Sequence, residues 1–368
     1  MRQSQHSPYQ FFIAAMGPGE IGQGMAFARY ALSRGNFVTL SVPHAGYLPL
    51  IRLRHPRFSS LIIKDSTVLK KTLNSKKVDI LVLCNSKIFT RNDNFHKYPP
   101  EPKIPSLSID SNWLFGPSSP YLSNPWVDRY CLNLPEPIFQ LGLKKNGGHY
   151  KIPKKILKKI SVVGLIPSYR PVSRQEKNKI RTHYGVHKNE KLIFLYTSIG
   201  YLIKPVVFLK AYAAAKKLRA KGKKVKVIYF GDPPPASLNA KDRRWFLTLP
   251  RTNTEHFSKV LASSDLVFQH QGLSTLEQAI GAQVPAIANV KDPKYMHAWE
   301  VGPFAKYGAC AMFFFNDSSD AIANCAEDIL FNKKRREAMR RKQRALYEKG
   351  EEKVYNEAIK LLKLSLHN

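Results

Sequence analysis

The sequence predicts an α/β protein in which strands and helices alternate around two parallel sheets. Short apolar runs such as 78–84 and 192–197 are almost continuous, as strands covered on both faces are. Helical patterns separate these runs, and the alternation starts again near residue 160, so we expect two similar halves. A chain of 368 residues is also too long for one ordinary core.

The two halves are expected to follow the same order of elements. The first opens with an apolar run, a glycine-rich stretch at 17–24, a helical pattern that stops at Gly35, and a second apolar run, which together make a βαβ unit. Expected strands are 11–16, 37–42, 60–63, 78–84, 107–109, 129–134, 160–164, 192–197, 225–230, 247–251 and 266–268. Expected helices are 25–33, 174–184, 205–220, 275–280 and a basic segment, 333–364.

The stretch 263–290 predicts a phosphate-binding site. It is expected to form a strand, a polar glycine turn at 269–274, and a helix that starts beside Ser274 and Thr275. This layout places a helix N-terminus at the carboxyl edge of a parallel sheet, where free N–H groups and the helix dipole attract an anion. Glu277 is close enough to reach a ribose hydroxyl. The alternative is an ordinary βαβ turn without a ligand.

This stretch resembles the nucleotide-sugar signature of glycosyltransferases with the two-domain GT-B fold. That resemblance implies an α/β fold of GT-B architecture, with two Rossmann-like domains whose parallel sheets face a central cleft. The gap from Gly272 to Glu277 is one residue shorter than in the plant and peptidoglycan branches of the family, and nearer to that of the lipid A disaccharide synthases. The matching residues are His270, Gly272, Ser274, Thr275, Glu277, Gly281 and Pro285.

The stretch 17–24 gives a second, independent match. Gly17, Gly19 and Gly22 follow the G-x-G-x-x-G spacing, but the acidic residue of a dinucleotide site is missing after the next strand. The stretch instead resembles the first glycine loop of the peptidoglycan N-acetylglucosaminyltransferase, with Glu20 where that family carries a histidine. Glu20 is therefore the candidate general base. The alternative is that Glu20 lies at the solvated tip of a loop.

The resemblance implies further contacts with the donor. Gly200 lies where the family contacts the donor phosphates, and Pro250 ends the short strand whose backbone reads the nucleobase. His297 and Glu300 stand where many relatives have Gln and Asn facing the donor sugar, so the identity of the donor sugar is left open. A structural role for His297 is the alternative.

The acceptor is expected to bind near Asn112 and Trp113, in the irregular stretch 111–125. An exposed ring there would stack on a sugar, although a packed loop is equally consistent with the sequence. The implied domains are 1–158 for the acceptor, 159–340 for the donor, and a final helix, 341–368, that packs back on the first domain.

The implied reaction is transfer of a sugar from a nucleotide-diphosphate donor, a UDP-sugar, to a hydroxyl acceptor that is lipid-linked or acidic. Inversion is expected. No Asp-x-Asp motif is present, so neither a metal nor another cofactor is expected. Two alternatives stay open. One is a nucleotide-sugar 2-epimerase of the same fold, and the other is a catalytically silent GT-B protein that binds an anionic polymer or a membrane.

The charge balance indicates an anionic partner. The chain has 59 Lys and Arg against 26 Asp and Glu, a net charge of +33. An anionic membrane, nucleic acid and a lysine-rich composition without function are the three explanations. No RNA-recognition, helix-turn-helix or zinc-finger pattern is present, so we favour a membrane surface or an acidic substrate over nucleic acid.

The location expected from the sequence is cytoplasmic, either soluble or peripheral on the inner face of the membrane. No run of about 20 apolar residues occurs, and the first ten residues lack the apolar core of a signal peptide. Four cysteines without metal-binding spacing are expected to be reduced thiols. They are Cys84, Cys131, Cys310 and Cys325.

Overall fold

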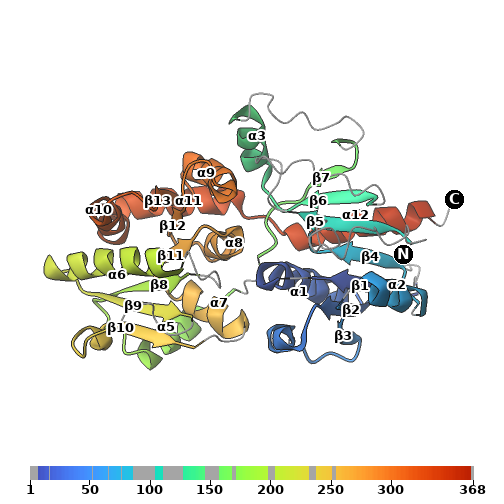
Figure 1. The fold of residues 1–368 in the computed structure, drawn as a ribbon, viewed down its shortest axis with the longest axis horizontal. Coiled ribbons are helices and arrows are strands. Elements are labelled where there is room, and N and C mark those ends of the chain that lie inside the picture. The colour runs from blue at the N-terminus through green and yellow to red at the C-terminus, as the bar shows by residue number, and fades with distance from the viewer. Residues whose placement is uncertain are drawn as a thin grey trace. The chain divides into compact units, whose positions relative to one another are not determined.

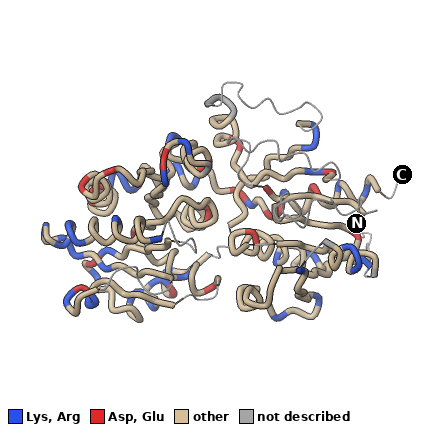
Figure 2. The backbone as a smooth tube through the Cα atoms, viewed as in Figure 1, with Lys and Arg blue, Asp and Glu red and all other residues tan. Residues whose placement is uncertain are grey.

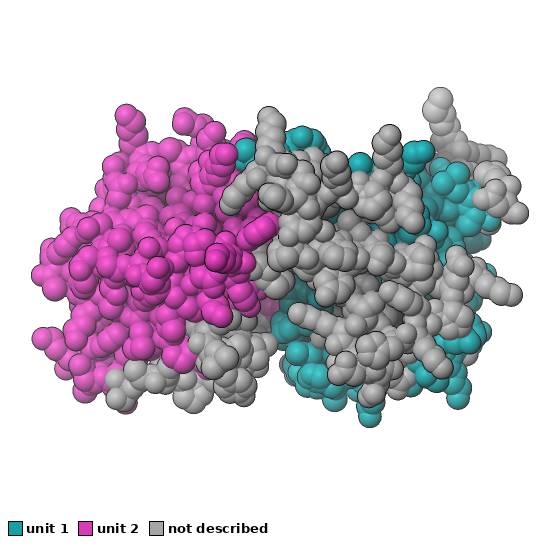
Figure 3. Space-filling model, turned by 45° about the horizontal axis from the view of Figure 1, so that its top comes forward, with its two compact units in different colours: residues 1–168, 348–368 teal, residues 169–347 magenta. Residues whose placement is uncertain are grey.

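The chain forms two compact units, which Figure 3 colours separately. Unit 1 comprises residues 1–168 and 348–368, and unit 2 comprises residues 169–347. The structure is a computed structural model. It describes residues 7–15, 17–51, 53–64, 66–75, 77–85, 104–110, 127–145, 157–167, 171–197, 204–231, 238–250 and 254–365.

Unit 1 contains a parallel sheet that, in its described residues, has seven strands in the order β3-β2-β1-β4-β5-β6-β7 (Figure 1). All of the pairings are parallel. The strands are β1 (Gln10–Ala14), β2 (Phe37–Val42), β3 (Phe58–Ile62), β4 (Ile80–Leu83), β5 (Ser106–Asp110), β6 (Arg129–Leu132) and β7 (Ile160–Val162).

Helices α1 and α12 contact each other over this sheet and enclose its main apolar core. Phe11 and Phe27 meet edge to face in that core, with ring centroids 5.5 Å apart. Glu357 of α12 also forms an ion pair with Arg129 of β6, with 3.2 Å between Oε2 and Nε. The helices of unit 1 are α1 (Pro18–Ser33), η1 (Ala45–Ile51), α2 (Ser66–Ser75), α3 (Glu136–Lys145) and α12 (Gly350–Ser365).

Unit 2 repeats this topology. The part of it that the structure describes forms a six-stranded parallel sheet in the order β10-β9-β8-β11-β12-β13, which corresponds to the first six strands of unit 1. In each unit the strand order reverses beside the first strand, and ligands of doubly wound sheets bind at the carboxyl end of that position. The strands are β8 (Lys191–Tyr196), β9 (Val225–Phe230), β10 (Phe246–Leu249), β11 (Leu266–His270), β12 (Ala286–Val290) and β13 (Ala311–Phe314).

The core of unit 2 is formed by the sheet with α6, α10 and Met339. Phe208 of α6 lies within 5.3 Å, centroid to centroid, of the rings of Tyr229 and Phe246, which anchors the helix on β9 and β10. The helices are α5 (Arg174–His183), α6 (Lys204–Ala220), η5 (Asp242–Arg244), α7 (Thr254–Ala262), α8 (Leu273–Ala282), α9 (Met296–Tyr307), α10 (Ser319–Phe331) and α11 (Lys333–Leu346).

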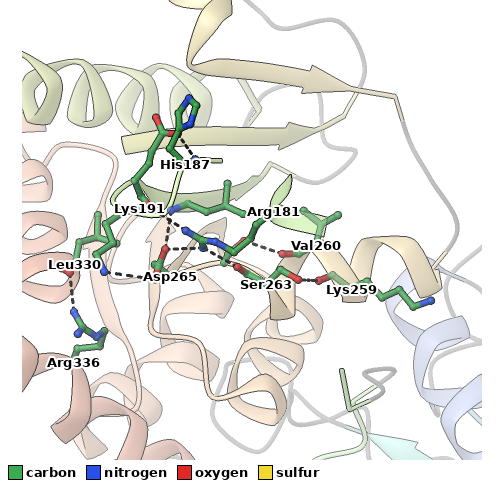
Figure 4. A network of polar contacts seen from close by, with 12 residues as sticks. Arg181, His187, Lys191, Lys259, Val260, Ser263, Asp265, Leu330 and Arg336 are labelled. Carbon is green, nitrogen blue, oxygen red and sulfur yellow. Dashed lines mark hydrogen bonds and ion pairs between the residues drawn. The ribbon is translucent and has the colours of Figure 1, made fainter. Parts of the chain in front are cut away.

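The amino ends of β8 and β11 are joined by a polar network around Asp265 (Figure 4). Arg181 of α5 donates to Asp265 Oδ2 over 3.0 Å, and the backbone N–H of Leu192 donates to the same atom over 2.9 Å. Arg181 also donates to the carbonyl oxygens of Ser263 and Glu190. One guanidinium therefore fixes a helix to two strands, at the edge of the sheet opposite the expected ligand site.

The observed boundaries correct two expectations about the domains. The strand near residue 160 was expected to open the second domain, but β7 pairs with β6 and therefore closes the first sheet. The basic segment 333–364 was expected to be one helix. It is two, because α11 ends at Leu346 and packs in unit 2, and only α12 returns to unit 1.

Two expected glycine turns are also shorter than predicted. Helix α1 begins at Pro18, so Gly19 and Gly22 lie within the helix and not in a loop. Pro at the first helical position and Glu20 two residues later are helix-start signals, which the glycine spacing masked. Likewise, β11 extends to His270 and α8 begins at Leu273.

Candidate functional site

The start of α8 lies at the carboxyl edge of the sheet in unit 2. Strand β11 ends at His270, and only Gln271 and Gly272 separate it from the helix. Gly272 is the N-cap residue and offers no side chain to the N–H groups of the first turn. Ser274 and Thr275 lie in that turn, half-buried and buried respectively. An uncapped helix start with small residues is suited to an anion.

His270 covers the N-cap. A Cβ atom added to Gly272 would lie 2.8 Å from both Cε1 and Nε2 of the His270 ring, so the ring lies directly against the glycine. The ring is partly exposed, but its Nδ1 atom is covered and has no hydrogen-bond partner among the described residues. Burial, with a smaller contribution from His297, lowers the pKa of His270 to about 3. The imidazole is therefore neutral near pH 7, and offers a hydrogen bond without a charge.

Two buried glutamines support this turn from below. Gln269 donates from Nε2 to the carbonyl oxygen of Gly272 over 3.3 Å, and its side chain is fully buried. Gln271 accepts the backbone N–H of Lys291 over 3.2 Å. The N-cap is thus attached both to its own strand and to the segment after β12. These glutamines were not picked out from the sequence, although Gln269 interrupts an apolar strand.

Glu277 lies one turn further along α8, and its side chain is only 1% exposed. The expected contact with a ribose therefore needs a local opening or a ligand that reaches into the helix packing. Its neighbour Gln278 accepts a hydrogen bond from Ser258 of α7 over 2.9 Å. The first part of α8 is consequently tied to α7 on this side. The ribose contact of Glu277 stays a prediction.

His297 and Glu300 are brought together on α9. His297 Nδ1 lies 2.6 Å from Glu300 Oε2, and the exposed fractions of the two side chains are 22% and 0%. This pair gives His297 the structural role that the sequence left as the alternative to sugar contact. Helix α9 contacts α8, and the His297 side chain is partly exposed. Contact with a donor sugar stays a prediction for both residues.

The other predicted donor and acceptor positions are less defined. Pro250 is exposed and follows β10 directly, at the same edge of the sheet. Gly200, Asn112 and Trp113 lie outside the residues that the structure describes.

A buried hydroxyl pair also lies at this edge and was missed in the sequence. Thr197 follows β8, and its Oγ1 atom lies 3.1 Å from the Tyr229 hydroxyl of β9. Both side chains are fully buried. The Tyr229 ring leaves no room for a Cβ on Gly231, which would lie 2.3 Å from its hydroxyl. The threonine could have been found because it ends an apolar strand.

In unit 1, Glu20 lies just beyond the carboxyl end of β1, beside the reversal of strand order. It lies in the first turn of α1, where Gly17 is the N-cap and donates its backbone N–H to Glu20 Oε2 over 2.6 Å. Asn85, two residues beyond β4, donates from Nδ2 to Glu20 Oε1 over 2.7 Å. The carboxylate therefore connects the two strands at the reversal of strand order. Its role as a general base stays a prediction.

A second carboxylate lies near this position and was not predicted. Asp110 ends β5 and is 2% exposed, and it accepts a hydrogen bond from Ser108. Strand β5 pairs with β4, so Asp110 lies at the same edge of the sheet as Cys84. Burial, then the charges of Glu20 and Asp110, raises the pKa of the Cys84 thiol. The sequence signal was a single acidic residue at the end of an apolar run, 107–109.

Within the described parts of the chain, no group of three or more His, Cys, Asp or Glu residues is placed to hold a metal ion. The same parts contain no helix that is long and apolar enough to cross a membrane. The four cysteines are free thiols.

The fold is shared with solved structures of other proteins. UGT2 of Phytolacca americana, solved with UDP-2-fluoro-glucose and pterostilbene, aligns over 97% of this chain and 100% of its own, with a TM-score of 0.66 and 13% identity. The fold is GT-B. MnaA of S. aureus, solved with UDP, aligns over 97% of each chain, with a TM-score of 0.66 and 12% identity. A glycosyltransferase from Rickettsia africae aligns over 99% of this chain and 100% of its own, with a TM-score of 0.61 and 13% identity.

The architecture expected from 263–290 is thereby confirmed: two Rossmann-like domains of the GT-B type. A Listeria monocytogenes structure solved as a UDP-N-acetylglucosamine 2-epimerase aligns over 91% of each chain, with a TM-score of 0.60 and 13% identity. At these identities the likeness establishes the fold alone. No protein-family model and no curated protein matches the sequence.

Proposed function

We propose that the chain is a glycosyltransferase that moves a sugar from a UDP-sugar to a hydroxyl acceptor, with inversion and without a metal ion. The start of α8 carries this proposal. Its N-cap is a glycine at the carboxyl edge of β11, beside the reversal of strand order, with Ser274 and Thr275 in the first turn. UDP is the favoured nucleotide because two neighbours were solved with UDP or a UDP-sugar.

The diphosphate of the donor would bind at the first turn of α8. The N–H groups there carry a partial positive charge, which stabilises the charge that develops on the leaving group. His270 is neutral, so it contributes a hydrogen bond and orientation. In this proposal the helix dipole and nearby lysines do what a divalent cation does in metal-dependent transferases.

Glu20 is the proposed base of the reaction. Its carboxylate takes the proton of the acceptor hydroxyl, whose oxygen then bonds to the anomeric carbon of the sugar. The bond from that carbon to the diphosphate oxygen breaks, and the nucleoside diphosphate leaves with the electron pair. Glu20 accepts one hydrogen bond on each oxygen, from Gly17 and from Asn85, and each oxygen has a further lone pair with which it can accept the acceptor hydroxyl.

A nucleotide-sugar 2-epimerase is the second candidate. Epimerisation moves a proton at a sugar carbon and needs acid and base groups around the ring. Asp110 at the end of β5 supplies a second carboxylate at the edge of the sheet where Glu20 bonds Asn85, which the sequence did not indicate. The likeness to the Listeria monocytogenes structure solved as a UDP-N-acetylglucosamine 2-epimerase agrees with this candidate.

The test begins with thermal unfolding of the purified protein in the presence of UDP, GDP, dTDP, ADP or CMP. A nucleotide at a hundred times its Kd should stabilise the protein by about 2.7 kcal/mol, which is visible as a shift in Tm. We expect UDP to give the largest shift, and the Glu277→Gln variant, which keeps the side-chain volume, to lose part of it. If none of the five nucleotides shifts the Tm, the result would support the silent GT-B protein instead.

Turnover then separates the two enzymes. With UDP-sugars as substrates, release of UDP in the presence of water or an acceptor indicates a transferase. Conversion of the sugar without release of UDP indicates an epimerase.

A further inference from the structure

Helix α11 carries a dense positive charge on one side. Eight of its fourteen residues are Lys or Arg and one is Glu, and Figure 2 marks these residues along the backbone. Met339, Gln343 and Leu346 are buried, and they hold the helix against α8 and α10. The side away from these residues is exposed.

The acidic residues around α11 are already paired. Helix α10 contacts α6 on one side and α11 on the other, and its carboxylates are used by both neighbours. Glu337, the one acid of α11, is used by Arg340 of the same helix. The pairs are Lys217–Asp320, Lys221–Glu327, Lys223–Glu327, Arg335–Asp328 and Arg340–Glu337.

Lys333, Lys334 and Arg341 are exposed and have no acidic partner in the described part of the chain. Lys334 and Arg341 are seven residues apart, which places them on the same side of the helix and about 10 Å apart along its axis. These cations therefore form a short row on an exposed, rigid surface. Such a row repels itself unless an anionic partner is near.

An exposed aromatic residue lies at the start of this row. Phe331 ends α10, is 36% exposed, and precedes α11 by two residues. The Lys223 ammonium lies 5.0 Å from the centroid of its ring. A ring whose face is covered by a cation is a poor platform for a nucleobase, but basic helices that lie on a bilayer surface combine Lys and Arg with apolar residues such as Phe.

We propose that α11 and Phe331 form a surface by which unit 2 binds an anionic lipid bilayer. The exposed cations attract the lipid headgroups, and the Phe331 ring enters the interface beside them. The attraction is reversible, because it depends on screened charges and one side chain. The same arrangement disfavours the stacking of a nucleobase, since Lys223 covers the face of the Phe331 ring.

The test is sedimentation of the protein with vesicles of phosphatidylcholine and phosphatidylglycerol, and with vesicles of phosphatidylcholine alone. We expect binding to the first alone, weakened by salt. The triple variant Lys333→Gln, Lys334→Gln, Arg341→Gln should bind roughly a hundredfold more weakly, at roughly fivefold for each cation removed. Phe331→Ala should weaken the binding that remains at high salt.

A matched control removes the same charge elsewhere in unit 2. Lys179, Lys188 and Lys241 are exposed and lie off α11, and their triple change to Gln should keep most of the binding. Equal loss in both triple variants would show a response to net charge alone and would overturn the proposal. So would wild-type protein that ignores anionic vesicles but binds duplex RNA through α11. An unchanged Tm in each variant establishes that the fold is intact.

Discussion

Asn85 donates a hydrogen bond from Nδ2 to Oε1 of Glu20 over 2.7 Å, and so joins the end of β4 to the start of α1. These two elements flank the reversal of strand order in unit 1. Glu20 is at once the cap of a helix and the acid at a position where such sheets bind ligands. A structural role and a catalytic role for Glu20 lead to different expected results when the carboxylate is replaced.

The Glu20→Gln variant separates the two roles. Glutamine keeps an acceptor for the Gly17 N–H, so stability should fall by no more than about 1 kcal/mol, as for the loss of a cap. It has no basicity, so turnover should fall roughly a hundredfold to ten thousandfold with little change in KM. Steady-state kinetics with the UDP-sugar that the turnover assay identifies measures both constants.

Asn85→Gly provides the control for this prediction. Asn85 has a backbone φ of 118°, which glycine adopts without strain, so the variant removes the amide alone. Glu20 stays a carboxylate with one partner fewer, and activity should survive. Full activity in Glu20→Gln would assign the carboxylate to capping only.

The His270 ring leaves no room for a side chain at Gly272. The φ of −80° and ψ of 144° at Gly272 suit any residue, so the obstacle to a side chain is the His270 ring 2.8 Å from the added Cβ. Gly272→Ala should displace this ring and weaken UDP binding roughly tenfold to a hundredfold, the range of overpacking costs. Calorimetric titration with UDP measures the change.

The double variant decides whether the ring is the cause. With His270→Ala in place, the alanine at 272 has room, so its further cost for UDP binding should nearly vanish. Independent, additive costs of the two changes would place the effect of Gly272→Ala in the backbone.

The lowered pKa of His270 predicts a dependence of stability on pH. Above about pH 6.5, the ordinary pKa of histidine, the ring is neutral in both folded and unfolded states and contributes no pH dependence. As the pH falls below that value, the unfolded chain takes up a proton first, because the folded pKa is about 3. Stability should therefore fall by about 1.4 kcal/mol for each pH unit in this window.

The measurement is urea unfolding of the wild type and of His270→Gln at several pH values. The difference in free energy of unfolding between the two proteins should be constant above about pH 6.5 and shrink as the pH falls. Parallel curves over the whole range would mean that the pKa of His270 is the same in the folded and unfolded states, so that burial does not lower it.

The fold was predictable because both halves follow hydrophobic rules that are local. Apolar runs such as 192–197 became strands, and the signature at 263–290 gave the GT-B architecture. Turn lengths were not predictable from glycine spacing. Gly24 lies inside α1, where a Cβ would be 3.1 Å from Cys84 Sγ, so this glycine reflects close packing against the sheet and not a turn.

The site was predictable at one residue of each interaction and seldom at its partner. The sequence indicates Glu20 and Gly272, but their partners have no motif of their own: Asn85 is 65 residues from Glu20, and Gln269 is three residues from Gly272. Their importance arises from parallel strands that end at the same edge of a sheet, which depends on register. For Glu277, the position in a helix was predictable from the sequence, but its burial by neighbouring elements was not.

Arg181 should matter more for stability than the ion pairs on the surface of unit 2. Its side chain is 21% exposed and bonds Asp265 and the carbonyl oxygens of Ser263 and Glu190 (Figure 4). Arg181→Met leaves these acceptors without their donor and should cost about 1–3 kcal/mol. The Lys217–Asp320 pair is 41% and 72% exposed, so Lys217→Met should cost less than about 1 kcal/mol. Urea unfolding measures both, and UDP binding should be unchanged because the network lies at the amino edge of the sheet. Equal costs for the two variants would mean that the connections that Arg181 makes from α5 to β8 and β11 add nothing beyond one ordinary ion pair.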